Sequence, residues 1–243
     1  MREGLFEIRE NTPLTHKVSR MRLGGDASAI AGPGQFVSLR LPELFLRRPF
    51  SVCDAEEDGF TILYEAVGRG TEAMRALPVG ARLEALTGLG TGYDLSLAGD
   101  APLLIGGGTG ASPLYFAAKR LLAAGKPVQV VLGFNTAADV LYEDEFLALG
   151  AAVSIRTVDG SYGRKGTVTE ALPPHSHFFA CGSEAMMRAV CAASPVSGQL
   201  CFDVRMGCGY GACMGCTRNT VKGPKRMCKE GPVLRKEEIL WDD

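Results

Sequence analysis

The chain has 243 residues, of which 46% are hydrophobic, and its formal net charge is −1. This length suits one or two ordinary domains with a small appendage, and the near-neutral charge disfavours nucleic-acid binding. The sequence shows no apolar stretch of membrane-spanning length, and its first ten residues mix both charges. We therefore expect a soluble protein of the cytoplasm with no membrane and no nucleic-acid partner.

The first part of the chain, 1–98, reads as β-rich. Short apolar runs such as FTILYEAV carry β-branched and aromatic residues, and turn signals such as Asp58-Gly59 separate them. Evenly spaced strands of this kind predict a small antiparallel β-barrel, interrupted by one helix over 71–77.

From 99 to 200 the pattern changes to strands that alternate with helices, which predicts an α/β domain with a mostly parallel sheet. The segment AADVLYEDEFLALG, for example, reads as one long helix. The helix that follows the strand APLLI has both ends marked. Ser112 is a plausible N-cap, Pro113 suits the first helical position, and Gly125 suits the position after the last turn. His175 and His177 lie in a proline-containing stretch, and we expect both at the surface.

The last block, 201–243, contains a cluster of cysteines. Cys208, Cys213 and Cys216 have the spacing C-x4-C-x2-C, and Cys228 follows after eleven residues. This spacing is typical of the plant-type [2Fe–2S] ferredoxins, and the small residues between the cysteines would let the backbone wrap a cluster. Cations in 205–229, with no acid among them, would favour a net-negative cluster. A structural zinc site and two disulfides are the alternatives.

Three segments of the first domain suggest a flavin site. Arginine followed by proline and serine at the start of a strand offers phosphate donors, and the glycine-rich opening of the 71–77 helix offers backbone amides. We expect the ring of Tyr64 to lie against the flavin. The predicted FAD residues are Arg48, Pro49, Phe50, Ser51, Leu63, Tyr64, Glu65, Gly70 and Thr71. Any one of these segments alone is better explained as a strand, turn or helix cap without a ligand.

A second glycine-rich segment, 106–113, joins a strand to a helix and predicts a dinucleotide site. The acidic residue expected after the next strand is replaced by Asn135, which departs from an ordinary Rossmann dehydrogenase; no arginine is there either, which favours NAD over NADP. Cys181 would end a strand near the flavin and the nicotinamide, which makes its thiol the candidate catalytic group, although a merely buried cysteine explains it at least as well. The predicted NAD residues are Gly107, Gly108, Thr109, Gly110, Cys181 and Gly182.

Taken in order, the segments R-P-F-S, G-R-G-T, the glycine-rich turn, LGF and A-C-G-S resemble the ferredoxin-reductase-like flavoproteins. The C-terminal M-G-C-G-Y-G-A-C-M-G-C with M-C-K-E-G-P-V narrows the resemblance to the electron-transfer subunits of type 1B dihydroorotate dehydrogenases. The resemblance covers nearly the whole chain. G-L-G-T-G-Y stands where that family often has P-L-G-N-G-F, and Thr109 replaces an apolar residue of its glycine-rich turn.

This resemblance implies an FAD barrel, an NAD-binding domain and a [2Fe–2S] module. Electrons from a separate FMN-bearing catalytic subunit, which oxidises dihydroorotate in de novo pyrimidine biosynthesis, would pass through the cluster and FAD to NAD. A heterotetramer with two copies of each subunit is expected. One alternative is a related subunit of a sulfite reductase, a hydrogenase or a ferredoxin transhydrogenase. Another is a non-enzymatic iron–sulfur redox sensor. Lys225 and Arg226 are candidates for the partner-binding surface around the cluster.

Overall fold

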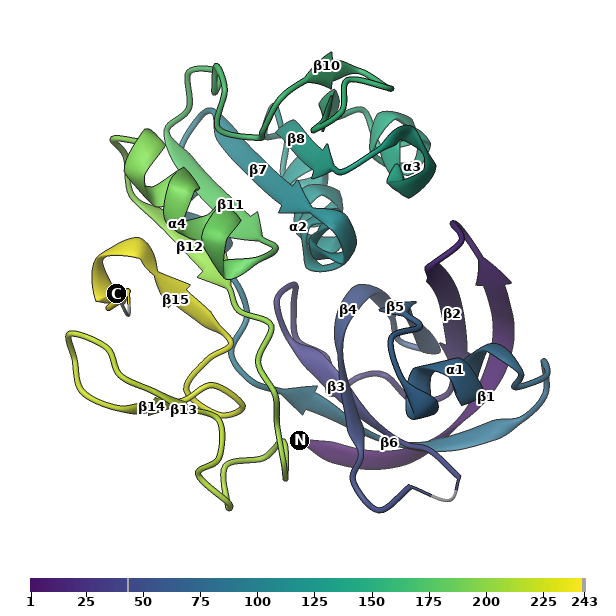
Figure 1. Ribbon diagram of the computed structural model, residues 1–243. Helices are drawn as coiled ribbons and strands as arrows, with labels where there is room; N and C mark the ends of the chain where they lie inside the picture. Colours follow the sequence, from purple (N-terminus) through teal and green to yellow (C-terminus); the bar gives the residue numbers. More distant parts are fainter. Residues whose placement is uncertain (43, 242–243) are drawn as a thin grey trace.

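The computed structural model describes residues 1–42 and 44–241. Figure 1 shows a barrel, a helix-covered sheet, and a yellow-green C-terminal region that runs alongside both. The barrel elements are β1 (Arg2–Pro13), β2 (Val18–Gly24), β3 (Phe36–Arg40), β4 (Arg48–Glu56), β5 (Gly59–Glu65), α1 (Arg69–Arg75) and β6 (Arg82–Leu89).

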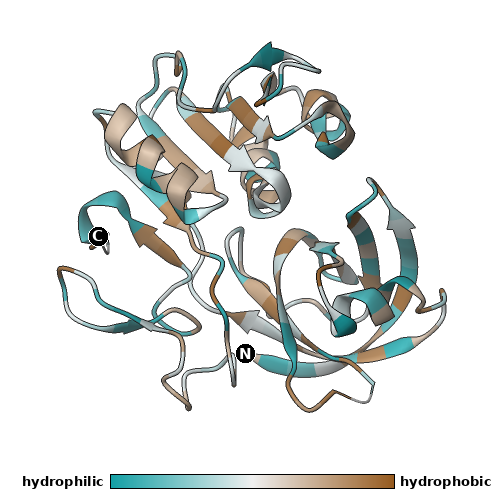
Figure 2. Ribbon diagram, viewed as in Figure 1, coloured by the Kyte–Doolittle hydropathy of each residue, from teal (hydrophilic) through white to brown (hydrophobic). Residues whose placement is uncertain are grey.

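The six barrel strands are antiparallel and close in the order β1-β2-β5-β4-β3-β6. Alternating burial along β6 places Leu83 and Ala85 inside while their neighbours face outward. Because side chains alternate across a strand, each strand contributes apolar residues to one shared interior, visible as alternating brown and teal bands in Figure 2. The predicted antiparallel barrel and its single helix are confirmed.

The second layer is a seven-stranded sheet in the order β10-β9-β8-β7-β11-β12-β15. All pairs from β10 to β12 are parallel. Its strands are β7 (Pro102–Gly107), β8 (Gln129–Phe134), β9 (Ala152–Thr157), β10 (Arg164–Lys165), β11 (His177–Cys181), β12 (Gly198–Cys201) and β15 (Val233–Arg235). The helices and turns are η1 (Leu95–Leu97), η2 (Gly108–Gly110), α2 (Ala111–Ala123), η3 (Ala137–Asp139), α3 (Glu143–Ala148), α4 (Glu184–Ala193) and η4 (Lys236–Glu238).

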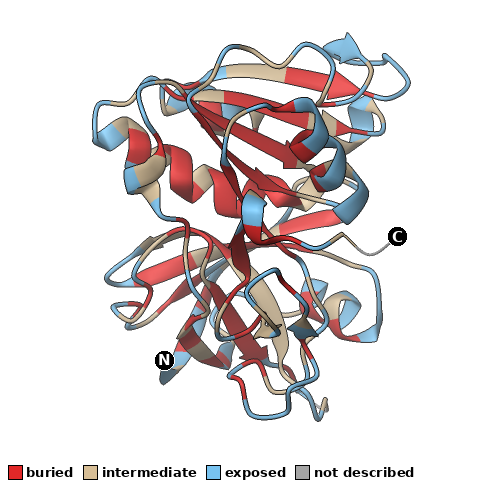
Figure 3. Ribbon diagram, turned by 90° about the vertical axis from the view of Figure 1, so that its left-hand side faces the viewer, coloured by how far each residue is buried: buried red, intermediate tan, exposed pale blue. Residues whose placement is uncertain are grey.

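Helices cover both faces of this sheet. Leu114 of α2 and Phe146 of α3 belong to the core on one face, whereas Met187 and Val190 of α4 belong to the core on the other. In Figure 3 the central strands are accordingly red, meaning buried, with exposed helix surfaces outside them. The predicted parallel α/β domain is confirmed.

The C-terminal block contains a short hairpin, β13 (Thr217–Arg218) with β14 (Lys225–Arg226), and then returns to the sheet. There β15 pairs antiparallel with β12, with Cys201 opposite Val233. The sequence did not indicate this return, because a three-residue strand has too few residues to show a periodicity.

Three local expectations were wrong. Helix α2 begins at Ala111 with Gly110 as its N-cap, and the Ser112 hydroxyl instead donates to the Ser51 carbonyl oxygen across the domain boundary at 3.3 Å. The long helix expected after β8 is divided into η3 and the short α3. His177 is 4% exposed and its Nε2 lies 3.2 Å from the side chain of Gln199. Gly125 does follow the end of α2 with φ +75°, as predicted.

No helix among the described residues is both long and apolar enough to cross a membrane.

Candidate functional site

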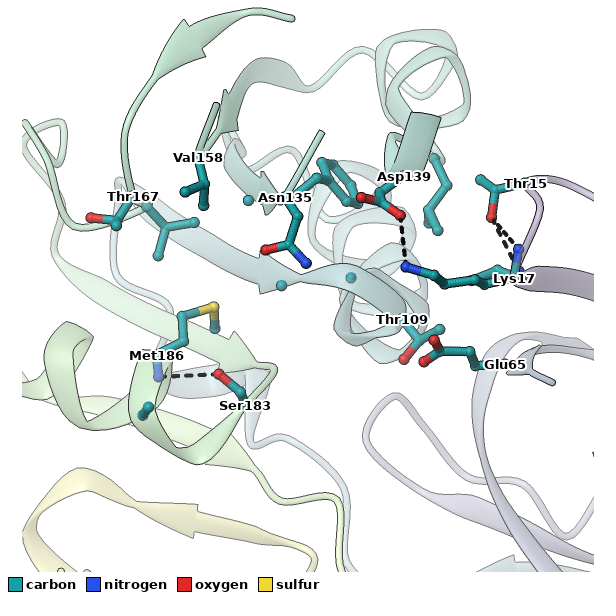
Figure 4. Close-up of a pocket in the computed structure, with 18 of the residues that line it drawn as sticks. Thr15, Lys17, Glu65, Thr109, Asn135, Asp139, Val158, Thr167, Ser183 and Met186 are labelled. Atoms are coloured by element: carbon teal, nitrogen blue, oxygen red, sulfur yellow. Dashed lines mark hydrogen bonds and ion pairs between the residues drawn. The ribbon is translucent and has the colours of Figure 1, made fainter. Parts of the chain in front are cut away.

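A cavity of about 540 Å³ lies between the barrel and the carboxyl ends of the parallel strands. Barrel residues form one wall, and residues from β7, β8, α4 and the segment after β10 form the others (Figure 4). Ligands of open α/β sheets bind at this edge. Because the cavity is lined by both domains, a ligand bound there would contact both.

The glycine-rich turn between β7 and α2 forms part of this wall. Gly107, Gly108 and Thr109 line the cavity, and Gly108 has φ +54° with open space where a side chain would be. A Cβ at Gly110 would lie 2.1 Å from the Cys181 carbonyl oxygen, so only glycine fits there. The turn therefore brings the N-terminus of the thirteen-residue α2 close to the cavity, where its amides favour an anion.

The predicted NAD residues at the end of β11, Cys181 and Gly182, lie close to the cavity but behind its surface. Cys181 ends β11 at the expected sheet edge, yet it is only 6% exposed and does not line the cavity. Its hydrogen bond with Cys201 and its burial raise the pKa of the Cys181 thiol well above the ordinary value. Above the neighbouring Gly182 lies Met186, whose side chain lines the cavity. The thiol of Cys181 is therefore not placed as a reactive group.

One acid of the cavity was missed by sequence reasoning. Asp139 in η3 lines the cavity four residues beyond Asn135, the position where an acid was expected. Its carboxylate accepts from the Thr136 amide and hydroxyl and pairs with Lys17 at 3.4 Å. Desolvation opposes its ionisation, but Thr136 and Lys17 hold the pKa of Asp139 below the ordinary value. The acid was hidden because the turn η3, and not the strand end, presents it.

The predicted FAD residues occupy neighbouring elements of the barrel. Arg48 begins β4, which pairs with β5, the strand that carries Glu65 into the cavity. The Arg48 side chain reaches the start of α1, where a Cβ at Gly70 would lie 3.4 Å from its Nε. Among the described residues Arg48 has no carboxylate partner and bonds only to backbone oxygens. A guanidinium that lacks a carboxylate partner and lies beside a helix start fits the diphosphate of FAD.

The side chains of two predicted FAD residues, Tyr64 and Thr71, make contacts within the protein. Tyr64 is 2% exposed, its hydroxyl donates to Asn11, and its ring lies in the barrel core, so the expected ring contact with a flavin does not match its position. The Thr71 hydroxyl is already used near Gly68, where it caps α1. Phe50 on β4 is half-buried. Its ring packs edge-on against the ring of Tyr64, with 6.2 Å between the two ring centroids. We therefore expect Phe50, not Tyr64, to offer a ring to the flavin.

The four clustered cysteines are linked as two pairs. The Cys213 amide donates to the Cys208 sulfur at 3.4 Å, and the Cys228 amide donates to the Cys216 sulfur at 3.4 Å. No three potential ligands among the described residues are arranged around a single metal ion. Two pairs suit a cluster with two thiolates on each iron, whereas a structural zinc ion needs four ligands at one point. All eight cysteines are free thiols in the structure, which lends the disulfide alternative no support.

Backbone amides point toward the cluster sulfurs. The Ala212 and Cys213 amides donate to the Cys208 sulfur at 3.3 and 3.4 Å. Desolvation would raise the pKa of the Cys208 thiol, but these donors outweigh it and lower the pKa to about 6. The loop therefore stabilises the thiolate, which is the form that binds iron.

The basic residues around the cluster are largely neutralised from outside the segment. Lys225 pairs with Glu238 at 2.8 Å, and Arg226 pairs with Glu230 and also donates to the Gly211 carbonyl oxygen. The sequence interval 205–229 contained no acid, so these partners were not foreseen. Both side chains are therefore held by ion pairs within the module, and their place on the partner-binding surface stays a prediction.

The chain resembles two known domain families. Residues 203–240 match the iron–sulfur cluster binding domain of dihydroorotate dehydrogenase B, and residues 104–192 match the oxidoreductase NAD-binding domain. A solved chain of an NADH-dependent reduced ferredoxin–NADP oxidoreductase has a TM-score of 0.88 and 28% identity, covering 98% of this chain and 90% of that one. The ferredoxin reductase of carbazole 1,9a-dioxygenase shares the fold at a TM-score of 0.66 and 21% identity, covering 79% and 64%.

These features define a ferredoxin-reductase-like oxidoreductase that uses FAD, a [2Fe–2S] cluster and NAD. Curated relatives are more specific. The "Dihydroorotate dehydrogenase B (NAD(+)), electron transfer subunit" of Bacillus pumilus is 36% identical over 98% of both chains. The protein of the same name from Listeria innocua is 36% identical over 96% of this chain and 97% of its own. The chain belongs to this family of electron-transfer subunits.

Proposed function

We propose that this chain carries electrons from an FMN-bearing dihydroorotate dehydrogenase subunit to NAD, in an assembly with two copies of each subunit. The observation that supports this most is the combination, in one chain, of paired cluster cysteines with a cavity between a flavin barrel and a nucleotide domain. Relatives that match 98% of the chain carry the corresponding name. The eight free thiols suit the reducing cytoplasm, where we place the complex.

We also propose three domains, 1–98, 99–200 and 201–243. The barrel ends with β6 at Leu89, and the sheet begins with β7 at Pro102, so the first boundary falls between them. The second boundary lies at the end of β12, before the chain turns to the cysteine loop. The return of β15 to the sheet means that the third unit shares its last strand with the second.

The chain's own residues bind and orient in this scheme. Bound FAD would supply the link between two-electron nicotinamide chemistry and one-electron cluster chemistry. Arg48 holds a phosphate of the flavin nucleotide, the turn at Gly108 and Thr109 receives the nicotinamide nucleotide, and the Cys208 loop holds iron. The dihydroorotate chemistry needs an acid–base group beside its substrate, and we assign that group to the partner.

The surface around the cluster loop is our candidate for the docking site of the catalytic subunit. Cys213 is exposed, and Tyr210 and Met214 beside it are 49% and 55% exposed. Exposed aromatic and methionine side chains are enriched at protein interfaces. Electrons must also enter close to the cluster.

Replacing these side chains tests the docking site. We expect Tyr210→Asp with Met214→Asp to weaken association with the catalytic subunit by at least about 2 kcal/mol, as for an interface anchor. Leu147→Asp is the control, because Leu147 is similarly exposed at 50% but lies on α3, far from the cysteine segment in sequence. Sedimentation of the mixed subunits gives the affinity, and absorbance confirms an intact cluster. Unchanged association of the double variant would contradict this assignment.

The electron route is tested in the purified complex under anaerobic conditions. Dihydroorotate should bleach the flavin and iron–sulfur bands, and added NAD should then give NADH. Bleaching by NADH but not by dihydroorotate would retain the reductase and reject this partner, in favour of a ferredoxin transhydrogenase or a related enzyme. The solved relative with a TM-score of 0.88 is such an oxidoreductase, which keeps that rival worth testing.

A further inference from the structure

The charges that line the cavity do not suit its proposed ligand. Lys17 is the sole lysine or arginine among the described lining residues, whereas Glu65 and Asp139 are both acids. A dinucleotide such as NAD carries two negative phosphates, and uncompensated like charges would repel it. Lys17 is therefore the lining side chain that can offset the charge of the ligand's phosphates.

That cation comes from the barrel, not from the nucleotide domain. Lys17 lies in the turn between β1 and β2, and its Nζ reaches across the cavity to an Asp139 oxygen at 3.4 Å (Figure 4). The Lys17 side chain is 48% exposed, so its ammonium is only loosely held. An ion pair as exposed as Lys17–Asp139 contributes little to stability. The flexible lysine side chain can therefore move its ammonium group to another anion.

Asp139 does not depend on Lys17 for its position. Its Oδ2 accepts from the amide and hydroxyl of Thr136, which fixes the carboxylate within η3. His16 approaches the other oxygen at 4.0 Å. Loss of the lysine would therefore leave the carboxylate in place with other donors.

We propose that Lys17 binds the diphosphate of NAD(H), exchanging its contact with Asp139 for the ligand. The glycine-rich turn and the N-terminus of α2 then face the diphosphate from one domain, and Lys17 faces it from the other. The bound nucleotide would thus join the two domains by charge. This proposal rests on the assignment of the cavity as the NAD site.

Binding measurements on the FAD- and cluster-loaded chain test this proposal, with NADH and ADP-ribose as ligands. ADP-ribose carries the diphosphate but no nicotinamide. We expect Lys17→Met to weaken both ligands roughly tenfold and to reduce the salt dependence of binding, because a screened charge contact is lost. Lys17→Arg should restore most of the affinity.

The matched control is Lys126→Met. Lys126 also pairs with an aspartate, Asp100, at 3.4 Å, but it follows the far end of α2 and does not line the cavity. It should leave both affinities unchanged. Equal losses in Lys17→Met and Lys126→Met would overturn the proposal, since the effect would then be one of overall charge.

Asp139→Asn separates the lysine from its present partner. If Lys17 binds the diphosphate, removing its competitor leaves binding unchanged or tightens it a few-fold. Weakening equal to that of Lys17→Met would show that the lysine only positions Asp139, which would overturn the proposal.

A cavity-filling variant, Ala185→Trp, checks the cavity itself, because Ala185 is an exposed lining residue of α4. It should abolish binding of both ligands. Binding that persists in this variant would reject the cavity as the nucleotide site. Abolished binding there, together with unchanged binding in Lys17→Met, would reject only the role of the lysine.

Discussion

Cys216→Ser should abolish electron transfer from the catalytic subunit to NAD while leaving reduction of the bound flavin by NADH intact. Cys216 is 7% exposed, and its sulfur accepts from the Cys228 amide at 3.4 Å, so the loop holds this ligand in a buried position. Changes outside the ligand sphere already cost 10–100-fold in metal affinity, so loss of a ligand should cost roughly 100-fold or more. Iron content and the visible spectrum measure the loss.

The control for this variant is Cys191→Ser. Cys191 is similarly buried at 9% but lies on α4, outside the cysteine loop. It should keep its iron and its electron transfer. A Cys216→Ser protein that retained the full cluster absorbance would mean that another residue supplies the fourth ligand.

Arg48→Ala should release FAD. The guanidinium has no carboxylate partner among the described residues and donates only through Nη1 to backbone oxygens, so its Nε and Nη2 remain available for a phosphate. A hydrogen bond to a charged group contributes about 1.5–3 kcal/mol, which corresponds to a roughly 10- to 150-fold increase in the Kd for FAD. Flavin retained after gel filtration, together with titration of the apoprotein, gives this number.

Arg40→Ala is the matched control. Arg40 ends the neighbouring strand β3 and pairs with Glu84 at 3.1 Å on the surface. Its loss should change the Kd for FAD less than about twofold, in line with the small contribution of an exposed ion pair. If both arginine variants lost flavin equally, the cause would be a weakened barrel and not a lost phosphate contact.

Sequence reasoning predicted best where the chemistry is local in the chain. The x4/x2 spacing of Cys208, Cys213 and Cys216 is a property of one loop, so it survives without knowledge of the fold. The glycine-rich turn at Gly108 was equally accessible, because a strand, a turn and a helix follow one another directly. The order of strands and helices then determined the fold class.

Contacts between distant segments could not be predicted in this way. Lys17 and Asp139 are 122 residues apart, and only the packing of the barrel on the sheet brings them together. The ion pair of Lys225 with Glu238 was not foreseen, because Glu238 lies outside the cysteine segment. Tyr64 was assigned to the flavin because strand alternation alone does not say which side faces the barrel interior.

The pairing of β15 with β12 fixes both ends of the cysteine loop to the sheet. With Cys201 opposite Val233, the loop leaves the sheet and rejoins it at the same point, so it is an insertion between two paired strands and not a tail. The paired strands β12 and β15 hold both ends of this insertion together. The residues between them can therefore lose their order without unpairing the strands, because the entropy cost of closing the loop is met by the strand pairing itself. Iron can therefore be delivered to a protein whose sheet is already complete, and proteolysis of the iron-free form should cut within the insertion and leave the barrel and sheet whole.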